Sequence, residues 1–281
     1  MSVPQVSREA LLHVVKTLPA APQILAQLGG LLLDINTDLD DLVTLISRDS
    51  ALTARIIRVS NSPLYNVGPP FGSLQEALAQ VGFKEVYRLT GFAAMAQVSE
   101  KKLAFYGWSS AQLRENSLLT ALVAEALADP GKMDPRTAYT AGLLRSTGKI
   151  ALDRLSKGPV QSDVHEAHRK LGLAAWEREQ MGLSNCEAAA TILQEWRFPA
   201  ATVNGIRDHY LIGNKAASPL AVLLNISAGA AERCGYGLTG ETNYFEFTQE
   251  KYALVDTNEQ AVEEAVVRAF DTFNQVRSAV G

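Results

Sequence analysis

Apolar residues recur at spacings of three and four along most of this 281-residue chain, as in helices packed on a core. Ile24, Leu28 and Leu31, for example, would share one face of an early helix. Alternation of apolar and polar positions, which is typical of a half-buried strand, is nearly absent. The pattern therefore predicts an all-α fold, an irregular bundle of many helices.

Capping residues place several of the helix ends. Acidic and polar residues at 36–41 and at Asp49 suit helix starts, because they face the positive end of the helix dipole. Ser73 and Glu76 form an S-x-x-E capping box, and Asp134 stands before a proline at the first helical position. Further helices are predicted over residues 83–98, 135–146, 149–156, 161–171, 173–181 and 184–197, with two more starting at Pro199 and Pro219.

Residues 235–256 differ from the rest of the chain, because aromatic residues, Thr and Gly are mixed there without helical spacing. A loop or a short hairpin is expected, followed by a last amphipathic helix. We divide the chain into an N-terminal helical subdomain, residues 1–107, and a second helical subdomain, residues 108–281, which ends in a C-terminal extension.

Charge and cysteine content narrow the class of protein. With 26 Lys and Arg against 30 Asp and Glu, the formal charge is −4, which disfavours nucleic acid as a partner. Cys186 and Cys234 lack the spacing of a zinc site or a disulfide framework, and burial is the expected role of Cys186. His165 and His168 are expected on an exposed helix face.

No apolar run is long enough for a membrane span and no signal peptide is evident, so a cytoplasmic protein is expected.

Residues 141–150, AGLLRSTGKI, are the most informative segment. They resemble the GLLHDIGK signature of the HD superfamily of metal-dependent phosphohydrolases. Other segments are similar to motifs of one bacterial branch, the HDOD domain (HD-related output domain): LPAAP at 18–22, LVTLISRDSALTAR at 42–55, SNSPLY at 60–65, SLQEA at 73–77 and VG at 81–82. By the order and spacing of these motifs the chain is identified as a member of the HDOD family over about residues 17–232, its second subdomain being HD-like.

The resemblance implies a site where His, a His-Asp pair and a later Asp bind a divalent metal, which lowers the pKa of a water nucleophile. The corresponding positions here hold poor ligands or none: Asn116, Arg145, Ser146 and, near Ser227, Ala228. A later pair of histidines is kept only in part, as His209 and Tyr210.

Arg145 opposes a metal actively, since a guanidinium stays protonated and has no lone pair to donate. A +1 charge ~4 Å from a +2 ion is repelled by roughly 8 kcal/mol at an effective dielectric constant of ~20. No carboxylate among the aligned ligand positions offsets that repulsion. We therefore expect no catalytic residues, no metal and no cofactor.

Two interpretations of Arg145 stay open. Arg145 and Lys149, four residues apart, could form an anion pocket with Asn116, Ser146 and His209, where a phosphate or nucleotide would bind. Alternatively, Arg145 fills the vacated volume through an internal salt bridge or a backbone carbonyl contact. His209 is either the remnant of a ligand cluster or a helix-terminal histidine held by a hydrogen bond.

The resemblance and these departures predict a non-enzymatic output module in bacterial signal transduction, a pseudoenzyme that acts by recognition. Its partners would be signalling proteins such as a kinase, a cyclase, a response regulator or a transcription factor, or a small anionic ligand. Two alternatives are a metal-dependent phosphohydrolase with an atypical site and a nucleotide sensor that does not hydrolyse its ligand.

Overall fold

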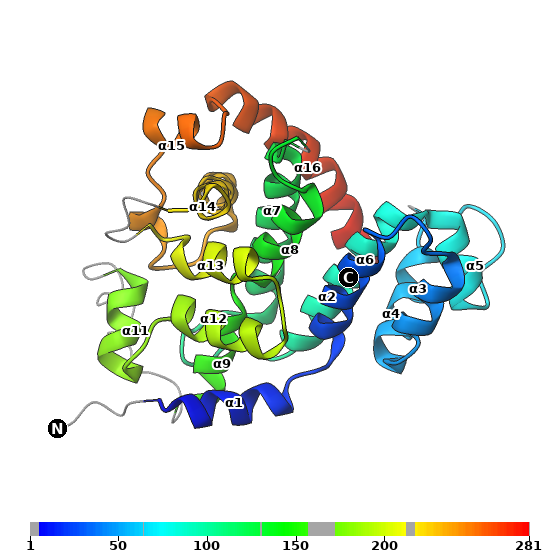
Figure 1. Cartoon of the computed structure of the whole chain (residues 1–281), viewed down its shortest axis with the longest axis horizontal. Helices are drawn as coiled ribbons and strands as arrows, with labels where there is room; N and C mark the ends of the chain where they lie inside the picture. The colour runs from blue at the N-terminus through cyan, green and yellow to red at the C-terminus, as the bar shows by residue number, and fades with distance from the viewer. Residues whose placement is uncertain (1–5, 64, 130, 157–171, 212–216, 281) are drawn as a thin grey trace. The chain divides into compact units, whose positions relative to one another are not determined.

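The computed structural model describes residues 6–63, 65–129, 131–156, 172–211 and 217–280. In these ranges the regular structure is helical, without a strand, and a bridge joins Leu103 to Trp108 (Figure 1). The prediction of an all-α fold is confirmed. The α-helices are α1 (Arg8–Thr17), α2 (Ala21–Leu31), α3 (Leu39–Ile46), α4 (Ser50–Ser60), α5 (Leu74–Val81), α6 (Phe83–Val98), α7 (Ser110–Leu127), α8 (Pro135–Leu144), α9 (Thr147–Leu155), α11 (Leu173–Met181), α12 (Asn185–Glu195), α13 (Ala200–Asp208), α14 (Pro219–Ala231), α15 (Gln249–Leu254) and α16 (Glu259–Val280).

The predicted helix starts coincide with observed caps. The Asp49 side chain accepts a hydrogen bond from the backbone of α4, and Asp38 forms a full capping box with Asp41 on α3. Ser73 caps α5, but the Glu76 carboxylate accepts from the Gly72 amide instead of completing the predicted box. These caps satisfy backbone donors that a helix start would otherwise leave without a partner.

The structure differs from the sequence predictions at α1 and at residues 235–256. Helix α1, capped by Ser7, was not predicted, although Leu11, Val14 and Val15 have helical spacing and form its buried face. For 235–256 the hairpin is wrong and the alternative of a loop holds for much of the stretch: a short π-helix (Glu232–Tyr236) ends at its start, and a loop with one 3₁₀ turn (Thr242–Tyr244) leads to α15. Its aromatic side chains pack onto helices instead of pairing across strands, as when Tyr244 stacks on Tyr210 with ring centroids 4.2 Å apart. The helix predicted over 161–171, with His165 and His168, lies outside the described residues.

By its internal contacts the chain divides into two compact units. One comprises Met1–Leu18 and Ser99–Phe270, and the other comprises Pro19–Val98 and Asp271–Gly281. The division at residue 107 stays a prediction, since compactness does not report which segments fold on their own. In the smaller unit α2 and α4 pack on α6, and in the larger unit α7 packs on α8 and α9 packs on α12.

Two glycines of the 141–150 segment allow helices of the larger unit to approach closely. A Cβ atom on Gly142 would lie 2.6 Å from the Cα of Ala121 in α7. A Cβ atom on Gly148 would lie 1.9 Å from the carbonyl oxygen of Asn185 in α12. Because no side chain fits in either gap, these contacts fix where the turn between α8 and α9 lies. That turn carries Arg145 and Ser146.

Candidate functional site

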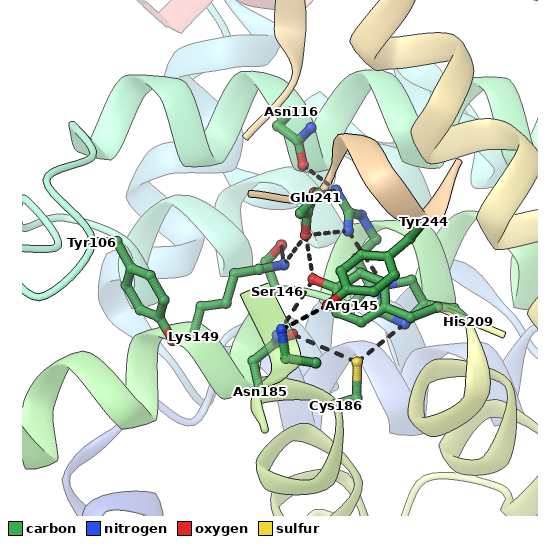
Figure 2. A network of polar contacts seen from close by, with 12 residues as sticks. Tyr106, Asn116, Arg145, Ser146, Lys149, Asn185, Cys186, His209, Glu241 and Tyr244 are labelled. Atoms are coloured by element: carbon green, nitrogen blue, oxygen red, sulfur yellow. Dashed lines mark hydrogen bonds and ion pairs between the residues drawn. The ribbon is translucent and has the colours of Figure 1, made fainter. Parts of the chain in front are cut away.

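The structure brings all five predicted site residues together. Asn116 comes from the middle of α7, Arg145 and Ser146 form the turn between α8 and α9, Lys149 lies in the first turn of α9, and His209 follows the end of α13. Each is at most 1% exposed. Figure 2 shows their side chains converging on one point. Their side chains belong to an interior polar network.

Glu241, which the sequence analysis missed, lies at the centre of this network (Figure 2). The two terminal nitrogens of Arg145 donate to its two carboxylate oxygens, each over 3.0 Å. The Lys149 ammonium lies 2.6 Å from Oε1, and the Tyr210 hydroxyl donates to the same oxygen over 2.5 Å. Arg145 therefore makes the internal salt bridge that was one of its two interpretations, with a partner outside the aligned ligand positions.

Asn116 and His209 complete the surroundings of Arg145. The Asn116 carbonyl accepts from Arg145 Nη2 over 2.5 Å, and its amide nitrogen donates to the backbone oxygen of Tyr236 over 2.6 Å. His209 Nδ1 lies 2.7 Å from the Ile206 carbonyl oxygen, which can only accept, so we assign the proton to Nδ1. His209 Nε2 then accepts from Arg145 Nη1 over 3.3 Å. The imidazole lone pair is thus already engaged.

Burial and charge set the protonation of these groups. Burial would raise the pKa of Glu241, but the charges and hydrogen bonds of Arg145 and Lys149 outweigh it and hold that pKa far below its ordinary value. Burial and the same two charges lower the pKa of His209 to about 3. Burial also lowers the pKa of Lys149, against the attraction of Glu241. At neutral pH the network holds a carboxylate, a neutral imidazole and two cationic side chains.

A second buried carboxylate lies beside the first network. Glu177 of α11 accepts from the Tyr106 hydroxyl and from the backbone and side-chain nitrogens of Asn185, each over 2.7 Å. The Asn185 amide also donates to the Tyr210 hydroxyl over 3.3 Å, which connects the two carboxylates through neutral groups. Burial raises the pKa of Glu177 to about 7. The run of charged residues Glu177, Arg178 and Glu179 suggests an exposed helix face, but Glu177 is completely buried.

The remaining predicted positions carry no ligand chemistry. Ala228 lies in an apolar cluster with Cys186, Tyr210 and Phe245, and the Ser227 hydroxyl donates to a backbone carbonyl of its own helix. Burial raises the pKa of the Cys186 thiol, which keeps the sulfur protonated. Cys186 is buried, as expected.

The divalent metal that the HD resemblance implies does not fit these residues. A metal site needs carboxylates and free imidazole nitrogens facing one point. Here one carboxylate faces a guanidinium and an ammonium, and the nearby imidazole accepts from the guanidinium. In the described part of the chain no three His, Cys, Asp or Glu side chains group as metal ligands.

A pocket of about 170 Å³ leads from the surface toward the network. Its lining includes Cys186 and Tyr210 on the inside, and Arg178 and Arg207 at the solvent. Each arginine pairs with a neighbouring carboxylate, Glu187 or Asp208. Tyr210 is the group shared by the pocket and the Glu241 network.

The amino-acid sequence matches a known protein family. The pattern of the HDOD domain matches residues 18–212. An uncharacterized protein of Treponema pallidum (strain Nichols) is 22% identical over 199 residues, which is 69% of this chain and 37% of that protein. The chain thus spans little more than a third of the length of this curated relative. None of the described helices is long and apolar enough to cross a membrane.

Three crystal structures share the fold. An HDOD domain protein of unknown function from Geobacter sulfurreducens is 20% identical, with a TM-score of 0.63 over 97% of this chain and 96% of that one. A Shewanella amazonensis SB2B protein, whose name suggests a phosphohydrolase, is 22% identical, with a TM-score of 0.68 over 97% and 98% of the two chains. A Marinobacter aquaeolei VT8 protein, whose name suggests signal transduction, is 18% identical, with a TM-score of 0.67 over 94% of this chain and 58% of that one. At these identities the likeness shows the fold alone.

Proposed function

This chain belongs to the HDOD domain family, and from that premise we propose that it is a regulatory module that acts by recognition and has lost metal-dependent hydrolysis. The observation that carries the proposal is the Arg145–Glu241–Lys149 group, buried where the resemblance expects metal ligands. A divalent ion there would meet two positive side chains, and it would have to take Glu241 from both of them. The donor set supports an internal ion pair over a catalytic centre.

The partners we propose are signalling proteins of the cytoplasm, such as a kinase, a cyclase, a response regulator or a transcription factor. The name of the Marinobacter structure, which suggests signal transduction, agrees with this class. Recognition would use helix surfaces of the family fold.

A metal-loading and turnover experiment tests the loss of hydrolysis. The protein is purified from medium supplemented with Mn, Fe, Ni, Mg and Zn, analysed for metals, and assayed with bis(p-nitrophenyl) phosphate. We expect less than stoichiometric metal and no turnover above the buffer rate. Stoichiometric metal with turnover that His209→Ala abolishes would refute the proposal and favour the atypical phosphohydrolase. Glu246→Gln, an exposed change, serves as the preparation control.

A further inference from the structure

Glu241 is bound as a receptor binds an oxyanion. Arg145 contacts it with both terminal nitrogens, the geometry by which arginine recognises carboxylate and phosphate. Lys149 and Tyr210 add two more donors. All three donors lie within the HDOD match at 18–212, whereas Glu241 follows that match by 29 residues, since 241 − 212 = 29. The family domain supplies the receptor and the C-terminal extension supplies the anion.

The charges of this receptor exceed those of its occupant. Arg145 and Lys149 together carry +2, and Glu241 carries −1. A phosphate monoester carries about −1.5 to −2 near neutral pH, so it matches the two cations better than one carboxylate does. Arg145 Nε is also buried and has no hydrogen-bond partner among the described residues. His209, the other titratable group on Arg145, is neutral and accepts from it.

The residues that carry Glu241 lie outside the α-helices and are held to them mainly by side chains. Residues 237–248, which we name the Glu241 segment, contain one short 3₁₀ turn and no α-helix. Within the described residues two backbone hydrogen bonds tie the segment to other elements, from the Leu173 amide to the Gly240 carbonyl over 3.0 Å and from the Tyr252 amide to the Thr248 carbonyl over 3.1 Å. Side chains supply further attachments: the Asn225 amide donates to the Tyr244 carbonyl over 2.9 Å, the Tyr244 ring stacks on Tyr210, and Leu238 and Phe245 are buried. A segment held in this way can leave without unfolding a helix.

The pocket described above lies beside the receptor. Tyr210, whose hydroxyl donates to Glu241, is part of its lining. Arg178 and Arg207 also line it, each paired with a carboxylate of the lining, Glu187 or Asp208.

We propose that Arg145, Lys149 and Tyr210 form a receptor for small phosphate-bearing molecules, which Glu241 occupies in cis. Binding of a phosphate group displaces Glu241 and frees the Glu241 segment, which changes the surface offered to a partner. The inference rests on the proposed regulatory function, for which it names a ligand class and a conformational response.

Amide hydrogen exchange on the full chain tests the displacement. Inorganic phosphate and adenosine 5′-monophosphate are titrated separately, at an ionic strength held constant with KCl. We expect a saturable rise of exchange in residues 237–248 and no rise with KCl alone. A response to both probes identifies the phosphate group as sufficient, whereas a response to the nucleotide alone identifies a nucleotide site. A wild-type protein that responds to neither probe overturns the proposal.

Variants separate displacement from anion binding elsewhere. Glu241→Gln removes the competing charge, so calorimetry should show at least tenfold tighter binding of the responding probe. Arg145→Gln should abolish binding, and the exposed Glu246→Gln on the same segment should leave affinity unchanged. If Glu241→Gln does not fold, Glu241→Asp, whose shorter side chain weakens the ion pair, should still tighten binding. An affinity unchanged in the folded Glu241 variant overturns the proposal. Metal-dependent turnover would refute the proposed function by a separate assay, whereas absent anion binding refutes this inference alone.

Discussion

Glu241 and Glu177 are two carboxylates buried completely in the same unit, and their surroundings are opposite. Glu241 faces two cationic side chains, whereas the donors to Glu177 in the described part of the chain are neutral, the Tyr106 hydroxyl and two nitrogens of Asn185. The pKa of Glu241 is held far below its ordinary value, and burial raises the pKa of Glu177 to about 7. Two equally buried carboxylates thus have pKa values shifted in opposite directions, because the hydrogen-bond and charge partners of a buried carboxyl group decide whether it is ionised or protonated.

The comparison separates two roles that buried acids can have. Two buried cationic side chains need a carboxylate between them, because without it each would be a buried positive charge with no negative partner. An acid among neutral donors is tolerated, and its hydrogen bonds can be kept in large part by an amide of the same shape. The same isosteric change should therefore have very different effects at the two positions.

The largest expected effect is the difference between Glu241→Gln and Glu177→Gln. Glu241→Gln leaves Arg145 and Lys149 buried without a carboxylate, so the free energy of unfolding should fall by about 3–5 kcal/mol. Glu177→Gln should change it by about 1 kcal/mol or less near pH 7. Urea unfolding followed by circular dichroism measures both. Equal losses in the two variants would show that the partners of these carboxylates do not set their contribution.

Much of the fold follows from the sequence, because caps and apolar spacing act locally. Asp49 caps the start of α4, and Pro219 is the first residue of α14, as predicted. The five residues named from the family motifs lie together in the structure, but those motifs and not local physics selected them. Local rules gave no position for Glu241, whose segment has neither helical nor strand spacing.

One physical signal pointed toward Glu241. Two cations predicted at the same interior site need an anion, since a buried unpaired charge costs several kcal/mol. The aligned ligand positions contain no carboxylate that could be this anion. The carboxylate comes from a position 96 residues after Arg145, and only the tertiary fold brings the two together. Glu177 gave no comparable signal, because its neighbours Arg178 and Glu179 suggested an exposed face.

A smaller effect should appear in the pH dependence of stability, where Glu177 can be isolated by comparing the wild type with Glu177→Gln. Because burial raises its pKa from 4.5 to about 7, the contribution of Glu177 is fully present below pH 4.5 and is lost as the pH rises through 7. The advantage of wild type over Glu177→Gln should therefore shrink by about 1–3 kcal/mol between pH 5 and pH 8.

Glu241 and His209 act in the opposite direction and are common to both proteins. Their lowered pKa values stabilise the fold above the unfolded values and lose that effect as the pH falls, for His209 from about 6.5 toward 3. The contributions of Glu241 and His209 therefore cancel when the stability of Glu177→Gln is subtracted from that of the wild type. Urea unfolding at each pH gives the two profiles, and parallel profiles would mean that Glu177 does not titrate in this range.

The smallest expected effect comes from removing the surplus cation. Lys149→Met leaves Arg145 and Glu241 as a one-to-one pair with two parallel hydrogen bonds, and it ends the cost of burying a second positive charge. The methionine keeps most of the apolar stem, so the free energy of unfolding should change by about 1 kcal/mol or less. Arg145→Met is the matched comparison, because it also removes the donors to Asn116 and His209, and it should cost about 3 kcal/mol or more. Urea unfolding measures the free energy of unfolding of both variants. If Lys149→Met costs as much as Arg145→Met, both cations are required to hold Glu241, and the excess of positive charge in the site is compensated by a group other than Glu241.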